Sequence, residues 1–374
     1  MKQEIKILKD LIEIKSTCDY SNKEIIFYIK KKLKKFESKI YKFKKNKLIL
    51  YNLVVKIKGK NSKNPKNPLV FSGHTDTVVV NSSWKKDPFK ALIKDNKIFG
   101  LGSSDMKSGL SAMITSVFNL NEKPKRDIYM IFTADEESNA LGIQNLISQK
   151  DFNIKNAMVI IGEPTDLNLR LGQKGILEIG FTLFGENGHA SQANKKFNDK
   201  NNAIYKAIKI IKYFQKLENE LCKKKDKNFG SSLINIGQIN GGCSVNSIPE
   251  KCYFTVSIRL LPQINIKLLY KKIKKETQQI IPEIQMKELF YGESFLTKTD
   301  SMAVKKIKNI LQKLKYNYKI QYSSGWSEAG YLKKIGSCIV IGPGNNNQAH
   351  KANEYAEIDK LSKSVMIYNQ LIKI

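Results

Sequence analysis

The segment VFSGHTDTV, residues 70–78, decides the fold because it joins a strand pattern to two potential metal ligands. Its apolar beginning predicts a buried strand, and Gly73 followed by His74 and Asp76 predicts a turn where that strand ends. Two polar residues in a turn are by themselves an ordinary finding. A histidine beside a carboxylate is also half of a metal site, so the rest of the chain decides between these interpretations.

Apolar runs with strand character recur along the chain, and helical patterns lie between some of them. We expect buried strands at 52–59, 67–73, 127–134, 156–163 and 337–344, and helices at 106–120 and 138–149. Strands that alternate with helices indicate an α/β domain. The expected sheet is largely parallel, with helices on both faces.

The middle of the chain follows a different pattern. We expect strands at 175–188, 231–242 and 250–262, and lysine-rich helices at 201–225 and 266–279. The first pattern then returns, with helices near 301–314 and 358–372. We therefore predict a discontinuous catalytic domain with an inserted α+β domain. The predicted boundaries are 1–175 and 291–374 for the catalytic domain and 176–290 for the insert.

Composition and charge describe an ordinary globular chain with an excess of lysine. The formal net charge is +31, but only three of the 65 basic residues are arginine, and the lysines are spread along the chain. Nucleic-acid sites usually mix arginine with aromatic residues on one face, so we expect no nucleic-acid partner. A positive field would still suit an acidic carrier protein. The scattered cysteines and the lack of an apolar run near ~18 residues predict a cytoplasmic protein without membrane contact.

Histidine and carboxylate side chains follow one expected strand after another, where ligands bind in open α/β sheets. They are His74 and Asp76, then Asp135, Glu136 and Glu137, then Glu163, then His350, with Asp105 after the glycine-bearing segment 98–104. Imidazole and carboxylate without cysteine suit zinc, cobalt or manganese in a hydrolytic site. Two metals need a bridging carboxylate and separate terminal ligands, and a spare acid would be the base.

Seven motifs occur in a fixed order along the chain: SGHTDTV, GLGSSDMKSGLSAM, TADEE, GEPT, GHAS, NSIPE and GPGNNNQAHKANEY. Together they resemble the di-zinc aminoacylase and carboxypeptidase family, which includes acetylornithine deacetylases and succinyl-diaminopimelate desuccinylases. The resemblance spans residues 5 to 370. It implies two Zn²⁺ ions, which Co²⁺ or Mn²⁺ can replace, and a homodimer in which the insert is both lid and dimerisation domain.

The resemblance also implies the metal ligands residue by residue. His74 and Glu163 would bind one zinc ion, and Glu137 and His350 would bind the other. Asp105 would bridge the two ions. The motifs that carry these five residues are the basis for transferring the ligand set to this chain, and no ligand is missing from it.

The remaining site residues are implied in the same way. Asp76 would hydrogen-bond the histidine of the first site and fix its tautomer, and Glu136 would be the general base. His189 on the insert would stabilise the oxyanion. Arg259 and Asn246 would hold the carboxylate of the substrate. The plain alternatives are that Asp76 is only a turn residue and that Arg259 is a surface arginine.

The implied activity is removal of an N-acyl group from a small N-acyl amino acid. GPGNNNQAHKANEY, GEPT and IRLLP look most like acetylornithine deacetylase, which converts N-acetylornithine and water to ornithine and acetate. Succinyl-diaminopimelate desuccinylase is the alternative, and ESFLT at 293–297 leans towards it. A metallo-dipeptidase, a carboxypeptidase and a hydrolase of carrier-linked amino acids stay open. A binding protein without chemistry would be expected to lack Glu136 or at least one ligand.

Overall fold

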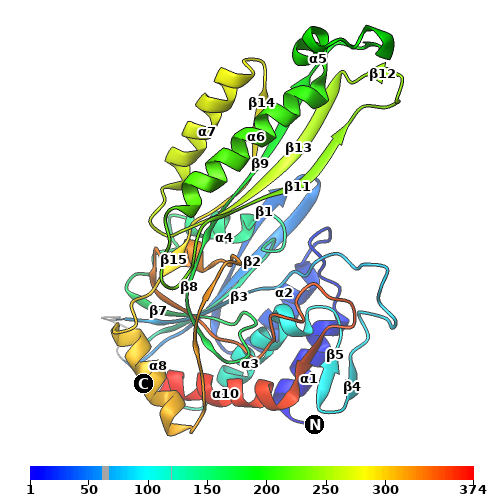
Figure 1. Cartoon of the computed structure of the whole chain (residues 1–374). Coiled ribbons are helices and arrows are strands. Elements are labelled where there is room, and N and C mark those ends of the chain that lie inside the picture. The colour runs from blue at the N-terminus through cyan, green and yellow to red at the C-terminus, as the bar shows by residue number, and fades with distance from the viewer. Residues whose placement is uncertain (61–66, 119) are drawn as a thin grey trace. The chain divides into compact units, whose positions relative to one another are not determined.

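The computed structural model describes residues 1–60, 67–118 and 120–374, so position 119 of the expected helix 106–120 lies outside the described residues. The chain separates into two compact units (Figure 1). The first unit consists of Met1–Gly172, Leu296–Gln321 and Ser327–Ile374. The second consists of Gln173–Phe295 and Tyr322–Trp326. Most of the second unit is therefore a single insertion into the sequence of the first.

A nine-stranded sheet forms the centre of the first unit, in the order β1-β2-β6-β3-β7-β17-β8-β15, with β16 paired to β8. Its strands are β1 (Glu37–Lys45), β2 (Leu48–Ile57), β3 (Leu69–His74), β6 (Ile128–Thr133), β7 (Ala157–Ile161), β8 (Leu169–Gln173), β15 (Phe295–Leu296), β16 (Ile320–Ser323) and β17 (Gly336–Val340). The central strands β6, β3, β7 and β17 are parallel, while β1 and β2 are antiparallel to their neighbours and β8 is antiparallel to β17. The prediction of an α/β fold with a parallel sheet is confirmed for this centre, and the antiparallel outer strands make the whole sheet mixed.

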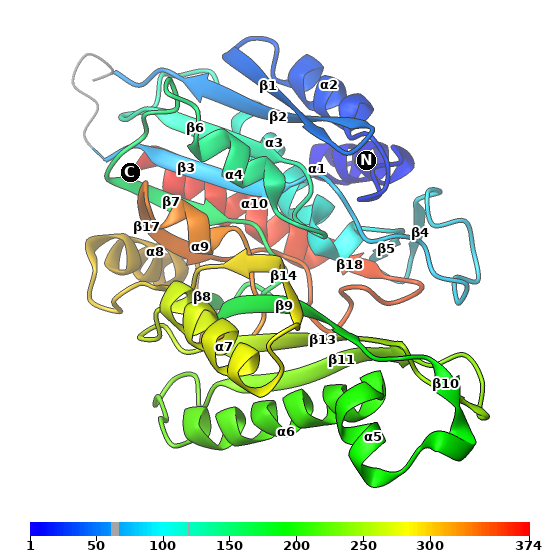
Figure 2. The ribbon, with the colours of Figure 1, turned by 90° about the horizontal axis from the view of Figure 1, so that it is seen from above.

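Helices cover both faces of this sheet, which explains why the central strands are mostly apolar. Figure 2 shows α3 and α10 on one face and α4 and α9 on the other. The helices of the unit are α1 (Gln3–Glu13), α2 (Lys23–Lys32), α3 (Ser108–Phe118), α4 (Leu141–Ile147), α8 (Met302–Lys313), α9 (Ala329–Leu332) and α10 (Ile358–Lys373). Every residue of β3 and β7 is buried. No helix among the described residues is long and apolar enough to cross a membrane.

A small sheet and two glycines position the segment before α3. The small sheet has the order β18-β5-β4 and consists of β4 (Leu92–Lys94), β5 (Lys97–Phe99) and β18 (Tyr355–Glu357). A Cβ atom on Gly73 would lie 2.3 Å from Met106 Cε, and one on Gly109 would lie 2.1 Å from the Gly162 carbonyl oxygen. Glycine at both positions lets α3 and its preceding turn approach the ends of β3 and β7.

The second unit is an antiparallel sheet with helices packed on one face (Figure 1). Its main sheet has the order β11-β13-β9-β14, and β10 pairs with β12 in a separate ribbon. The elements are β9 (Gly175–Phe184), β10 (Gly188–His189), α5 (Lys195–Asn201), α6 (Ala203–Cys222), β11 (Leu233–Gly241), β12 (Ser247–Ile248), β13 (Lys251–Leu260), α7 (Ile266–Ile280) and β14 (Gln285–Gly292). Alternate residues of β13 are buried, as expected for a strand with one covered face.

Candidate metal centre

The ends of the parallel strands bring the predicted ligands to one edge of the sheet. β3 ends at His74, and β6 ends at Thr133, one residue short of the acidic residues 135–137. Glu163 lies in the loop after β7, and His350 lies in the loop after β17. Because the carboxyl ends of parallel strands meet at the same edge, these side chains converge on it.

Asp105 lies between the two histidines and faces each with a different oxygen. His74 Nε2 is 3.2 Å from Asp105 Oδ1 and 3.7 Å from Glu163 Oε1. His350 Nε2 is 2.9 Å from Glu137 Oε2 and 3.8 Å from Asp105 Oδ2. The structure therefore brings the five predicted ligands together as two groups that share Asp105.

The donor atoms of this cluster fit a divalent cation. One ligand atom each from His74, Asp105 and Glu137 lies within 4.8 Å of the others. Ligand atoms about 2.1 Å from a tetrahedral zinc ion lie roughly 3.4 Å apart, so a small contraction would suffice. Nitrogen and carboxylate oxygen donors suit zinc, cobalt and manganese. The residues present are chemically adequate for a two-metal centre.

Burial and mutual repulsion disfavour the ionised forms of several acids in this cluster. Burial raises the pKa of Glu163 to about 8, and the neighbouring Asp105 adds to the rise. Burial also raises the pKa values of Glu136 and Glu137. A hydrogen bond from His350 to Glu137 raises the pKa of the histidine to about 9. A bound cation would stabilise the ionised carboxylates, which gives the cluster an electrostatic reason to bind metal.

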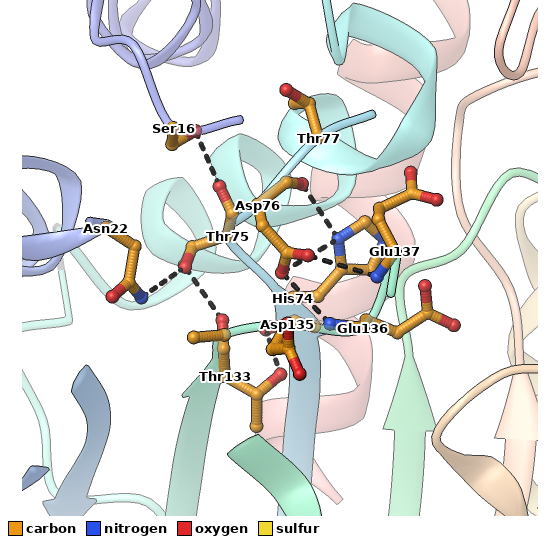
Figure 3. Close-up of polar contacts among 12 residues, drawn as sticks. Ser16, Asn22, His74, Thr75, Asp76, Thr77, Thr133, Asp135, Glu136 and Glu137 are labelled. Atoms are coloured by element: carbon orange, nitrogen blue, oxygen red, sulfur yellow. Dashed lines mark hydrogen bonds and ion pairs between the residues drawn. The ribbon is translucent and has the colours of Figure 1, made fainter. Parts of the chain in front are cut away.

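Asp76 connects His74 to the acidic loop, but through different atoms from those expected (Figure 3). The main-chain carbonyl oxygen of Asp76 lies 3.0 Å from His74 Nδ1, whereas its carboxylate oxygen Oδ1 lies at 3.8 Å. The carboxylate accepts hydrogen bonds from the main-chain N–H groups of Glu136 at 3.2 Å and Glu137 at 3.0 Å. The closer partner of the imidazole is thus the carbonyl, and the carboxylate orders the loop that carries the predicted base.

The predicted residues of the insert belong to the second unit. His189 ends β10 opposite Ser247 of β12, and the Ala190 N–H donates to the Asn246 carbonyl oxygen at 2.9 Å. Arg259 is the second-to-last residue of β13, which begins shortly after β12. A strand rises about 3.3 Å per residue, so Arg259 lies roughly 25 Å from Lys251, the first residue of β13. The structure therefore brings His189 and Asn246 together and places Arg259 towards the other end of the sheet.

Two buried glutamates border the metal cluster and have no role in the sequence analysis. Glu354 accepts hydrogen bonds from the main chain of residues 102–105. Glu328 Oε2 accepts a hydrogen bond of 2.8 Å from Thr133 Oγ1, beside His74 in the register of β3 and β6. Within the described part of the chain its Oε1 has no hydrogen-bond partner, and burial raises the pKa of Glu328 to about 8. A glutamate in the otherwise uncharged stretch 321–332 was the available signal for Glu328. The signal for Glu354 was its position four residues after His350.

The sequence matches a known family over most of its length. Residues 70–374 match the profile of peptidase family M20/M25/M40. An acetylornithine deacetylase from Buchnera aphidicola subsp. Schizaphis graminum (strain Sg) is 33% identical over 318 residues, covering 82% of this chain and 81% of that protein. A succinyl-diaminopimelate desuccinylase from Buchnera aphidicola subsp. Acyrthosiphon pisum (strain APS) is 29% identical over 321 residues, covering 82% and 83%.

The fold agrees with that assignment. An M20 family metallo-carboxypeptidase, Sso-CP2 from Sulfolobus solfataricus, superposes with a TM-score of 0.82 at 20% identity. The superposition covers 100% of this chain and 99% of that one. The resemblance inferred from the ordered motifs is therefore confirmed. The chain belongs to peptidase family M20/M25/M40 and is a metal-dependent hydrolase that acts on amide bonds.

Proposed function

We propose that this enzyme is an acetylornithine deacetylase, which hydrolyses the amide bond of N-acetylornithine to give ornithine and acetate. The observation that carries the proposal is the pair of ligand groups joined at Asp105, with the half-buried acid Glu136 beside them. The relative of that name at 33% identity favours the acetyl substrate. The coarser activity, hydrolysis of an amide bond, does not depend on this choice of substrate.

Two Zn²⁺ ions are the proposed cofactors. His74 and Glu163 would hold one ion, Glu137 and His350 would hold the other, and Asp105 would contact both. When bound, the ions would polarise the substrate carbonyl and lower the pKa of a water molecule. Because every ligand is nitrogen or carboxylate oxygen, Co²⁺ or Mn²⁺ could replace zinc.

Glu136 is the proposed general base. It would accept a proton from the attacking water as the new bond forms between oxygen and the carbonyl carbon. It would then give that proton to the amide nitrogen as the carbon–nitrogen bond breaks, which releases a free amine. The hydrogen bond from the Glu136 N–H to Asp76 Oδ1 supports this role because it fixes the main chain that carries the base.

The inserted domain supplies the remaining proposed residues. His189 would stabilise the developing oxyanion, and Arg259 and Asn246 would bind the carboxylate of the substrate. Because Arg259 lies at the far end of β13 from the other two, this proposal needs the homodimer, in which His189 and Asn246 of one subunit would complete the site of its partner. The contact between the loops of His189 and Asn246 supports a shared task for these two. The roles of residues 176–290 as lid and dimerisation domain stay proposals. Sedimentation velocity would test the dimerisation role through the mass of the assembly in solution.

The test of the substrate is release of primary amine from N-acetylornithine and N-succinyl-diaminopimelate, measured side by side with the same zinc-loaded protein. Preference for the acetyl compound supports the proposal. Preference for the succinyl compound would instead assign the desuccinylase activity named for the 29% identical relative. Activity on neither compound, in protein that binds two zinc ions, would contradict both and direct the search to peptides or carrier-linked amino acids. The net charge of +31 makes an acidic carrier the first of these to test.

A further inference from the structure

Two loops of the first unit carry predicted ligands and lie against each other although they are about 245 residues apart. We call residues 100–107, which contain Asp105, the bridge loop, and residues 342–354, which contain His350, the histidine loop. β18 directly follows the histidine loop and pairs antiparallel with β5, which directly precedes the bridge loop. The small sheet therefore brings the start of the bridge loop next to the end of the histidine loop.

Glu354, the last residue of the histidine loop, is bound to the main chain of the bridge loop. Its Oε1 accepts hydrogen bonds from the N–H groups of Ser104 at 2.7 Å and Asp105 at 2.8 Å. Its Oε2 accepts a third from the Gly102 N–H at 2.8 Å. Its carbonyl oxygen accepts from the Gly100 N–H at 3.0 Å. With 1% of its surface exposed, Glu354 makes these bonds without competition from solvent.

The chemistry of this contact requires a carboxyl group. The three N–H groups precede α3, which begins at Ser108, and buried N–H groups without an acceptor are unfavourable. An ionised carboxylate offers two oxygen acceptors and no donor. A glutamine offers one oxygen, and its NH₂ group would face at least one of the N–H donors. A Glu354→Gln substitution would therefore keep the shape of the side chain and lose part of the contact.

Ser104 provides a second connection between the same two loops. Its hydroxyl donates to the Asn345 carbonyl oxygen at 3.0 Å and accepts from the Asn345 N–H at 2.8 Å. This connection uses the beginning of the histidine loop, whereas Glu354 lies at its end. His350 lies between these two attachments, so both contacts limit how far its loop can move from Asp105.

The two predicted metal sites differ in how strongly the fold fixes their histidines. His74 is the last residue of a central strand, and only 1% of its side chain is exposed. His350 lies in a loop with 57% of its side chain exposed, and its Nε2 is 3.8 Å from Asp105 Oδ2. Loss of the contacts between the loops should therefore affect the site of His350 more than that of His74.

We propose that Glu354 is a positioning residue of the metal centre, which holds Asp105 at the distance from His350 that one metal ion can bridge. This proposal rests on the ligand assignment of the proposed function but not on its substrate. Substitution of groups that orient metal ligands typically lowers metal affinity 10- to 100-fold. We expect a decrease of that size at one of the two sites.

The experiment is a metal titration of Glu354→Gln, Glu354→Ala and the wild-type protein after removal of metal with a chelator. Equilibrium dialysis with Zn²⁺ measures the number and affinity of the sites, and the visible absorption of bound Co²⁺ reports their geometry. The wild-type protein should bind two ions. Glu354→Gln should weaken one site about 10- to 100-fold and leave the other within about 3-fold. Glu357→Gln, on a partly buried ion pair with Lys360 three residues later, is the matched control and should behave as wild type.

Ser104→Ala keeps the proposal testable if Glu354→Ala does not fold. It removes the second connection by loss of one hydroxyl, and it should weaken the same site as Glu354→Gln. Two sites of wild-type affinity in both variants would overturn the proposal, and so would an equal loss of both sites, because that indicates a general structural role. A wild-type protein that binds only one ion would overturn the ligand assignment beneath it. A wild-type protein that binds two zinc ions but does not hydrolyse N-acetylornithine would contradict the proposed substrate and leave the proposal for Glu354 unchanged.

Discussion

The main-chain carbonyl oxygen of Asp76 lies 3.0 Å from His74 Nδ1, and this contact separates two tasks within one residue. The carbonyl can fix the tautomer of the imidazole, so that Nε2 faces Asp105. The carboxylate is left to order the loop of Glu136 through two main-chain N–H groups. A substitution of the side chain should therefore disturb the acidic loop, which carries the predicted base Glu136 and the predicted ligand Glu137, more than it disturbs His74.

Asp76→Asn tests this separation. The asparagine retains the carbonyl next to His74 but replaces one of the two acceptor oxygens with an NH₂ group. We expect the affinity of the zinc site at His74 to stay within about 3-fold of wild type, and kcat to be about 10- to 100-fold lower, because the loop that carries Glu136 and Glu137 loses a hydrogen bond. Loss of the metal ion at His74 with unchanged kcat would mean that the carboxylate, not the carbonyl, holds the histidine.

Glu136→Gln tests the role of the general base. Glutamine cannot accept the proton from water, so kcat should fall about 10²- to 10⁴-fold, while both metal sites should remain. Metal content measured by atomic absorption, together with the rate of amine release, distinguishes the two effects. Ser138→Ala in the same loop is the control and should retain activity. A Glu136→Gln enzyme with near-normal turnover would exclude this residue as the base.

His189→Ala tests the contribution of the inserted domain. If the imidazole stabilises the oxyanion, its removal should lower kcat about 10²- to 10³-fold. Zinc affinity should not change, because the ligands all lie in the first unit. Gln192→Ala, in the exposed turn that follows, is the control. An equal loss of activity in both variants would point to the conformation of this turn and not to the histidine.

Glu328→Gln tests the electrostatic environment beneath the metal cluster. Thr133 is its hydrogen-bond donor, and His74, Asp76 and Asp135 are the charged groups that act on it. Burial raises the pKa of the folded state to about 8, from an ordinary value near 4.5. Between these values the unfolded chain is ionised while the folded protein keeps the proton, so stability falls as the pH rises.

In metal-free protein, the free energy of unfolding of Glu328→Gln relative to wild type should therefore increase from pH 5 to pH 8. The increase should be on the order of a few kcal/mol and should level off above pH 8. Urea unfolding at several pH values measures it, with Glu122→Gln on the exposed surface as control. A difference between the two proteins that does not change with pH would show that Glu328 ionises normally in the folded state.

Much of the fold was predictable because its central elements have strong patterns. The apolar run that becomes β3 ends in a glycine and a histidine, and the runs that become β7 and β17 are equally continuous. β1 was missed because lysine, glutamate and serine occupy much of it, and its pairing with β2 fixes it as an edge strand. The helix expected at 138–149 begins only at Leu141, because Ala140 adopts a positive φ of 50°.

The site was predictable where single side chains supply the chemistry, as at His74, Asp105 and His350. It was not predictable where the main chain does so. The carbonyl of Asp76 as partner of His74 depends on the course of the turn after β3. The task of Glu354 depends on three N–H groups about 250 residues away, which only the folded chain brings to it.

The most direct test of the central claim is the rate of amine release from N-acetylornithine as Zn²⁺ is added to chelator-stripped protein. We predict no activity without metal and a rise that levels off at two equivalents of zinc. Asp105→Ala should bind less zinc and show no such rise, because neither ligand group is complete without that carboxylate. Full activity of the stripped wild-type protein, or full activity of Asp105→Ala, would contradict the account of a two-metal centre joined at Asp105.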